Sequence, residues 1–198
     1  MAAMYQASIA AGGSLPLMMG WYSGPFGSPD IVRLEQPAHR ALQRGDGVMV
    51  EIEGRWGGYV SQIDQSVTFG EVPEWAEDAH KAAVQCWHDV FATIRPGVRF
   101  EELRQAAKKI ERTRKAIGGL IMHGRGLGDD GPLILPFAGS ESRADQDVLV
   151  EDTVFVIKPN VTYKGHQNVG HVGETVRVTR SGAERLGTRP IEHYWHVD

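Results

Sequence analysis

Two carboxylates on one predicted strand are the first residues of the sequence that could do chemistry. In the stretch Val48–Glu53, aliphatic residues alternate with Met49, Glu51 and Glu53. Because successive side chains of a strand point to opposite faces, one face would enter the core and the other would present both glutamates. Two carboxylates on one face can form a pair with a raised pKa. Glu53 could equally be solvated at the edge of the sheet, and the sequence leaves this choice open.

Histidines supply the second candidate chemistry. His166 and His171 lie in the polar stretch 164–171 and could bring imidazoles over a pocket, where they would act as acid and base. They could also be surface or hydrogen-bonded loop histidines. His193 and His196 lie near the C-terminus, where a metal site would be adventitious and the chain is usually mobile.

The composition favours one globular domain. The chain has 198 residues, a formal net charge of -4 and 41% hydrophobic residues, which is enough to build a core. The slight acidic excess gives no electrostatic case for a nucleic-acid partner. The single cysteine, Cys86, cannot form an internal disulfide, which favours a reducing cytoplasm. No apolar run of about 18 residues is available to cross a membrane.

Strands on either side of two helices must position the candidate groups. Apolar residues at spacings of three and four predict helices over Pro73–Ile94 and Phe100–Lys115. Alternating or β-branched stretches predict strands at residues 15–19, 48–53, 59–63, 66–69, 120–123, 153–157 and 175–179, with a loop over Gly20–Asp30. This order predicts the α+β class, with Val48, Val50 and Ile52 facing the helices.

Four stretches of the sequence, taken in their order and spacing, resemble one family. They are Arg44–Ile52 with Gly58–Tyr59, then Ile94–Val98, His123–Gly128, and Val156–Val161 with Gly173–Gly182. Together they resemble the pita-bread family of methionine aminopeptidase, aminopeptidase P, prolidase and creatinase. The resemblance implies a single domain over residues 1–198 with a curved, mostly antiparallel sheet and helices on its outer face. Residues 44–188 match the family better than residues 1–43, which would form a partial first half.

The resemblance also implies that this chain belongs to a branch with a degenerate metal site. Peptidases of the family hold two divalent ions with two Asp, one His and two Glu. The motifs place these five ligands on Glu51, Gln62, Arg125, Lys158 and Gly173, or on Glu174 if the register of the last motif slips by one. At about 4 Å and an effective dielectric constant near 20, one unit positive charge repels a divalent ion by roughly 8 kcal/mol. We therefore expect no dinuclear metal centre and no cofactor.

The function implied by this resemblance is metal-independent C–N bond hydrolysis on a small carboxylate-bearing substrate or a short peptide. Glu51, His166 and His171 would be catalytic, and Lys158 would help to anchor the substrate carboxylate. The other expected substrate-binding residues are Tyr59, Gln62, Arg125 and Glu174. A catalytically inactive binding or scaffolding module is the alternative, and an Xaa-Pro metallopeptidase ranks third. The resemblance also makes a homodimer the expected assembly.

The start of the chain suggests a missing neighbour. Residues 1–13 are apolar and end in Gly12-Gly13, as the last turns of a helix would. The first helix pair of the fold would precede Met1, so we expect an N-terminally truncated chain. Without that pair, an apolar patch near Leu15–Met19 and Val48 would need a partner subunit or upstream sequence to cover it.

Overall fold

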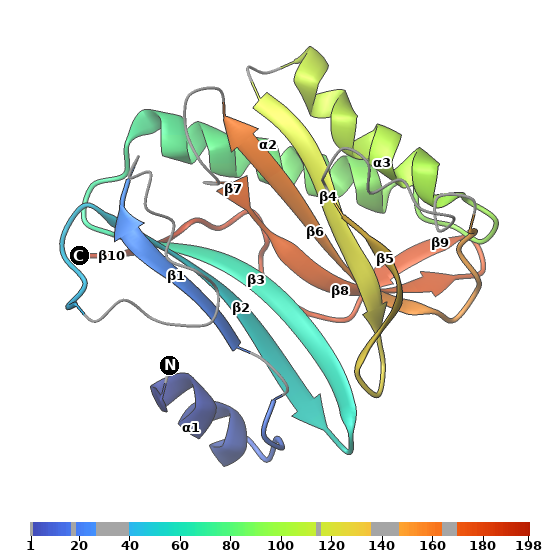
Figure 1. Ribbon diagram of the computed structural model, residues 1–198, viewed down its shortest axis with the longest axis horizontal. Coiled ribbons are helices and arrows are strands. Elements are labelled where there is room, and N and C mark those ends of the chain that lie inside the picture. The colour runs from blue at the N-terminus through green and yellow to red at the C-terminus, as the bar shows by residue number, and fades with distance from the viewer. Residues whose placement is uncertain (1, 17–18, 27–39, 114–115, 136–146, 164–169) are drawn as a thin grey trace.

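The computed structural model describes residues 2–16, 19–26, 40–113, 116–135, 147–163 and 170–198, which form a curved sheet with two helices packed on one face (Figure 1). The described part of the sheet has ten strands, with the central order β1-β2-β3-β8-β6-β4-β5. The strands are β1 Met19–Pro25, β2 Asp46–Trp56, β3 Tyr59–Phe69, β4 Ala116–Arg125, β5 Asp129–Ile134, β6 Val154–Tyr163, β7 Gly170–His171, β8 Gly173–Thr179, β9 Gly182–Arg185 and β10 Trp195–Val197. Among these strands, β10 beside β3 is the one parallel pair. The predicted curved, mostly antiparallel sheet is confirmed.

Helices α2, Glu74–Phe91, and α3, Phe100–Lys108, close the core over one half of the sheet. They pack on β4, β6 and β7, as Figure 1 shows behind the ribbon of β6. Their buried faces meet strand residues such as Leu120, Phe155 and Val176 in one apolar cluster. Burying such side chains contributes about 1.5–3 kcal/mol each, so this half of the sheet is the stable base of the fold.

Two sequence expectations about this core need correction. The second helix was expected to reach Lys115, but α3 ends at Lys108 and a 3₁₀ turn, η1 Lys109–Arg112, follows it. Val48 and Val50 are buried as expected and Ile52 is half-buried, yet among the described residues none of the three is part of the cluster that α2 and α3 form. Strand β2 lies two positions beyond β8 in the sheet, so it is too far across the sheet to face these helices.

The N-terminal region also differs from its prediction. Helix α1, Ala2–Ala10, is followed by Gly12 at φ 91°, in agreement with a helix end there. The first strand, however, is Met19–Pro25, so it covers much of the stretch that was expected to be a loop. Helix α1 has no buried residue and lies apart from the helical layer (Figure 1). The expected apolar patch is only partly present, because Leu15 is 63% exposed while Met19 and Val48 are buried.

Strands β3 and β8 meet along a short seam in the middle of the sheet. Backbone pairing there joins Ile63 to Glu174 and Asp64 to Gly173. Thr175 extends the seam, since its hydroxyl accepts a hydrogen bond from the backbone N–H of Gln62 and donates one to the backbone carbonyl of Gln62, both at 2.8 Å. This seam joins the two halves of the sheet and positions the polar residues described below.

None of the helices in the described part of the chain is long and apolar enough to cross a bilayer.

The contact between α3 and β4 leads to a test of the fold. A methyl group on Gly118 would overlap the carbonyl oxygen of Ala107 and lie 2.7 Å from the Cγ2 of Ile110. We expect Gly118→Ala to lower the free energy of unfolding by about 1–3 kcal/mol, because α3 must shift away from β4. Gly128→Ala is the control, because no atom lies within 4 Å of its added methyl group, and it should change stability by less than about 0.5 kcal/mol. Urea unfolding followed by tryptophan fluorescence measures both, and equal stabilities would contradict this packing.

Candidate active site

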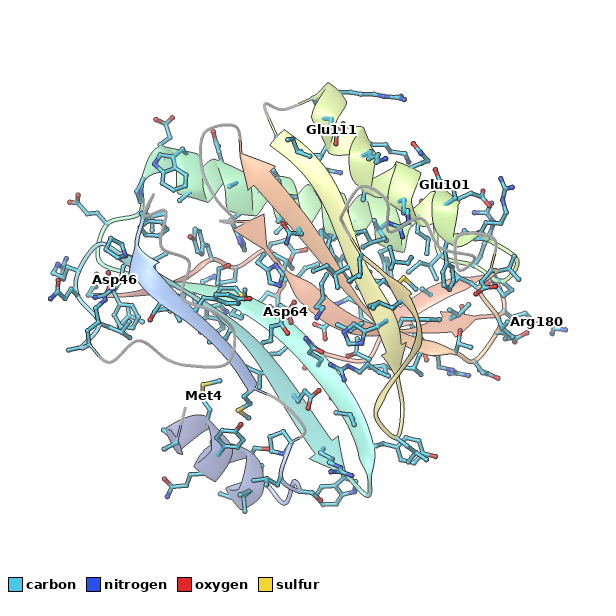
Figure 2. The ribbon with its side chains drawn as sticks, viewed as in Figure 1. Met4, Asp46, Asp64, Glu101, Glu111 and Arg180 are labelled. Carbon is cyan, nitrogen blue, oxygen red and sulfur yellow. The ribbon has the colours of Figure 1, made fainter. Side chains whose placement is uncertain are left out.

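The candidate site is built on two carboxylates that face each other across neighbouring strands. In the β2–β3 pair, Glu51 stands directly opposite Asp64. Both side chains are buried, with Asp64 fully so and Glu51 6% exposed. Across the neighbouring strands, Gly20 on β1 is paired with Glu51, and Gly173 on β8 is paired with Asp64. These four residues form one row across the sheet, in which glycines flank the two acids. Figure 2 shows Asp64 near the centre of the sheet.

Gly173 leaves the space that Asp64 occupies. A methyl group on Gly173 would lie 2.6 Å from the Cγ of Asp64. Any side chain at position 173 would therefore compete with the Asp64 carboxylate. The aspartate fills the place where the sequence motif puts the last metal-binding glutamate of the family.

Two basic side chains from the other half of the sheet meet the acids. His171 places Nε2 2.6 Å from Oδ2 of Asp64 and 3.9 Å from Oε1 of Glu51. Lys158 places Nζ 3.5 Å from Oε2 of Glu51. Both are buried, at 5% and 4% exposure. With the imidazole protonated, two positive charges balance two negative ones.

Gln62 completes the cluster as a neutral donor. Its side-chain amide donates to Oε2 of Glu51 at 3.2 Å and to Oδ1 of Asp64 at 3.0 Å. A carboxylate at this position would have added a third negative charge. The amide instead supplies N–H groups, which stabilise the two carboxylates in their charged form.

The environment moves the pKa values of the two acids apart. Burial and the neighbouring Asp64 charge raise the pKa of Glu51, although Lys158 and His171 oppose the shift. Burial alone would raise the pKa of Asp64 as well, but His171, Lys158 and Gln62 outweigh it and hold that pKa below its usual value. Opposite shifts in a pair of neighbouring acids are typical of sites that transfer protons, because one acid stays ionised while the other can exchange a proton.

Tyr22 on β1 is half-buried and close enough to the two acids for their charges to affect it. Burial, with the charges of Glu51 and Asp64, raises the pKa of Tyr22 to about 12, so its phenol stays neutral. A neutral phenol can donate a hydrogen bond to a bound ligand. Tyr22 lies in the stretch that was expected to be a loop, so its place beside the site was not predicted.

The structure brings four of the eight predicted site residues together: Glu51, Gln62, Lys158 and His171. Arg125 lies elsewhere and forms a buried ion pair with Glu53 at 2.9 Å. Glu53 is thus neither solvated nor paired with the carboxylate of Glu51. Its partner is a fully buried guanidinium.

The other predicted residues lie outside this cluster or outside the described residues. Glu174 is buried against Arg185, at 3.1 Å, and Arg189, at 3.5 Å. Tyr59 is at the hairpin end of β3 and 66% exposed. His166 lies outside the described residues.

Arg189 forms hydrogen bonds to the backbone of β3 and β8 at the cluster. Its guanidinium donates to the carbonyl oxygens of Asp64, at 2.9 Å, and Gly173, at 2.5 Å. It also donates to the side-chain oxygen of Gln65. These bonds reinforce the seam between β3 and β8 at the position of Asp64, so the C-terminal segment contributes to the geometry of the site.

Asp64 is the site residue that sequence reasoning missed. It follows Gln62 by two positions, and such residues share one face of a strand. Antiparallel register then puts it opposite Glu51, because Glu53 is paired with Gln62. The alternation of β3 was therefore a usable signal, but the family motif directed attention to position 62 alone.

A pair of divalent metal ions does not fit these residues. Within the described residues, Glu51, Asp64 and His171 are the group that could ligate a metal, and they offer one ligand atom each. Two of the three are already bound by the Gln62 amide, and the Lys158 ammonium is 3.5 Å from Glu51. The donor set is too small for two ions, and the cation opposes them.

Comparison with known proteins places the chain among peptidases. A sequence model of metallopeptidase family M24 matches residues 22–180. A probable dipeptidase PepE of Mycobacterium bovis is 28% identical over 180 residues, covering 86% of this chain and 44% of the relative. An Xaa-Pro dipeptidase of Pyrococcus furiosus is 25% identical over 152 residues, covering 74% of this chain and 41% of the relative.

Solved structures agree on the fold. The dipeptidase PepE of Mycobacterium ulcerans superposes with a TM-score of 0.77 at 25% identity, covering 99% of this chain and 51% of that one. The prolidase of Pyrococcus furiosus gives a TM-score of 0.73 at 20% identity, covering 96% of this chain and 54% of that one. The chain thus spans about half the length of these proteins, or less.

The lowered pKa of Asp64 predicts how stability depends on pH. A carboxyl whose pKa is depressed on folding adds stability above its unfolded value, near 3.9, and loses that contribution as the pH falls through the folded value. Asp64→Asn should therefore cost roughly 3 kcal/mol at pH 7, because it leaves buried cations without their partner. The difference from the unmutated protein should shrink between pH 5 and pH 3 in urea unfolding experiments.

The matched control is Asp198→Asn, because the Asp198 side chain is 92% exposed. It should change stability by less than about 0.5 kcal/mol at any pH. A stability difference for Asp64→Asn that stays constant or grows toward pH 3 would contradict the assignment.

Proposed function

Because the chain belongs to metallopeptidase family M24, we propose that it uses this fold for metal-independent hydrolysis of a C–N bond in a short peptide or small carboxylate-bearing amide. The relatives named as dipeptidases support the substrate class. The proposal departs from the family in one respect, which is that this chain's own cations take the place of metal ions.

One observation carries the proposal: two opposed, buried carboxylates are in contact with Lys158 and His171. Their opposite pKa shifts favour the ionised form of Asp64 and make Glu51 the easier of the two to protonate. Such a separation is what a hydrolase needs to take a proton from water and deliver one to a leaving amine.

The residues take distinct roles in this proposal. Asp64 orients His171 and stabilises its protonated form, as the carboxylate of an acid–base dyad does. Glu51 removes the proton of the attacking water, and protonated His171 supplies one to the leaving nitrogen. Lys158 provides N–H groups for the oxygen that becomes negative in the transition state. Gln62 keeps its two N–H groups on the carboxylates of Glu51 and Asp64. Tyr22 supplies a neutral phenol that can donate a hydrogen bond to the substrate.

The anchor for a substrate carboxylate differs from the sequence expectation. Arg125 is paired with Glu53, and Glu174 is paired with two arginines, so the proposal does not assign the anchor to them. We assign it to Lys158, whose Nζ lies 3.5 Å from Oε2 of Glu51. A homodimer and a cytoplasmic location remain proposals from the sequence.

A binding module is the second candidate, and the burial of the site favours it. Glu51, Asp64, Lys158 and His171 are each at most 6% exposed and contact one another. A cluster filled by its own side chains can serve as the rigid centre of a domain that binds peptides without cleaving them. This candidate predicts no hydrolysis and a purely structural role for His171.

The test compares two histidine variants under chelation. We expect the protein to hydrolyse a member of a panel of dipeptides and N-acyl amino acids in the presence of EDTA. His171→Gln should lower the rate by about 10²–10⁴-fold, the usual contribution of acid–base catalysis. His88→Gln is the control, because His88 is half-exposed and contacts Glu192 on the surface, and it should leave the rate unchanged.

Three outcomes separate the candidates. Activity that requires added manganese, cobalt or zinc would overturn the metal-independent proposal. No hydrolysis of any substrate, combined with peptide binding detected by calorimetry, would favour the module. A His171→Gln variant with full activity would remove the imidazole from the mechanism.

A further inference from the structure

The donor geometry around His171 contains the outline of a site for one metal ion. The ligand atoms of Glu51, Asp64 and His171 lie within 4.8 Å of one another. They come from three strands, β2, β3 and β7, and all three side chains are buried. Two carboxylates and one imidazole form a common ligand set for a single divalent ion, with metal–ligand distances of about 2.0–2.2 Å.

Two of these ligand atoms contact each other and have no other hydrogen-bond partner in the described part of the chain. Nε2 of His171 and Oδ2 of Asp64 are 2.6 Å apart, and neither has another hydrogen-bond partner among the described residues. Asp64 is fully buried and His171 is 5% exposed, so water does not satisfy these atoms freely. A metal ion that binds both atoms would therefore have to displace only this one close contact.

Lys158 and Gln62 both contact the proposed ligands, but only Lys158 opposes the binding of a metal ion. The Lys158 ammonium contacts the Glu51 carboxylate at 3.5 Å, and the Gln62 amide donates to both carboxylates. Gln62 can retain this role beside a metal, since each carboxylate has a second oxygen. Lys158 differs because its full positive charge lies beside the centre of the triad and repels any cation there.

Removing that charge changes the balance of the site. Counted with a neutral His171, as a metal ligand must be, the two carboxylates and Lys158 sum to a net charge of -1, and a divalent ion would leave the cluster at +1. Without Lys158 the same three ligands carry -2, which one divalent ion neutralises. The ligand set is thus complete for one ion, and one side chain opposes its use.

We propose that Lys158 is a tethered counter-ion that keeps the Glu51–Asp64–His171 triad free of metal, and that a neutral residue at position 158 turns the triad into a binding site for one divalent cation. The inference rests on the metal independence of the proposed function and explains how that independence is maintained. It assigns Lys158 a role that is separate from any contact with substrate.

Cobalt is the probe, because its visible absorption reports ligand number and geometry. We expect Lys158→Met to bind one equivalent of Co²⁺ with an affinity at least about 100-fold above that of the unmutated protein. Lys158→Arg, which keeps the charge, is the matched control and should bind no better than the unmutated protein. The double variant Lys158→Met with His171→Ala should lose the gain, because it lacks the nitrogen ligand.

Folding of each variant is checked by circular dichroism. Lys158→Gln, which keeps a hydrogen-bond donor for Glu51, replaces Lys158→Met if the latter does not fold, and it is judged by the same outcomes. A folded neutral variant that binds no Co²⁺ overturns the proposal. Equal gains in Lys158→Arg and Lys158→Met overturn it too, because the charge would then be irrelevant.

These outcomes are distinct from those of the proposed function. If Lys158→Met binds Co²⁺ and the unmutated protein hydrolyses no substrate, this inference holds and the proposed enzymatic function is wrong. Chelator-resistant hydrolysis with no binding in the neutral variants would do the reverse. Tight binding of Co²⁺ by the unmutated protein would overturn both.

Discussion

Two carboxylates buried directly opposite each other, Glu51 on β2 and Asp64 on β3, are the constraint on which the rest of this structure depends. Like charges across a strand pair are destabilising, and burial makes each charge costlier still. Neighbouring side chains offset this destabilisation. His171 and Lys158 bring positive charge from the other half of the sheet, and Gln62 donates to both acids. The basic side chains thus offset part of the cost of burying both acids where the two halves of the sheet meet.

The architecture around the row follows from the same requirement. The seam between β3 and β8 has few backbone pairs, and Thr175 and Arg189 add side-chain bonds across it. Glycine at position 173 gives Asp64 its space, and Gly187 is needed in the same way, because a methyl group there would overlap the carboxylate of Glu174. Asp64 and Glu174 thus each have a basic side chain beside them and a glycine that leaves space for the carboxylate.

The sequence predicted the fold well because fold information is spread along the chain. Alternation in β2, the apolar stripes of α2 and α3 and the order of four motifs all indicated the same curved sheet. Helix ends and β1 were less accurate. The η1 turn depends on how α3 packs against Gly118, and β1 pairs with β2 in a stretch rich in glycine and proline that local propensity assigns to a loop.

The site was harder to predict because it depends on register between distant strands. Glu51 and Lys158 could be placed from motifs, and they do meet. Asp64 was missed because its role comes from standing opposite Glu51 and in the space left by Gly173. Arg125 was expected near Glu51, but β4 brings it to Glu53 instead, two residues further along β2 and on the same face. Sequence motifs identify candidate charged residues, whereas the pairing register of the strands determines which of them come into contact.

The central claim is that this chain balances the charge of its core site with its own side chains. Anomalous X-ray diffraction from crystals of the unmutated protein, grown with excess Mn²⁺ and measured at the manganese edge, tests it most directly. The account predicts no anomalous peak between Glu51 and Asp64, with density for the Lys158 ammonium beside Glu51. One or two strong peaks ligated by Glu51, Asp64 and His171, with Lys158 turned away, would contradict it.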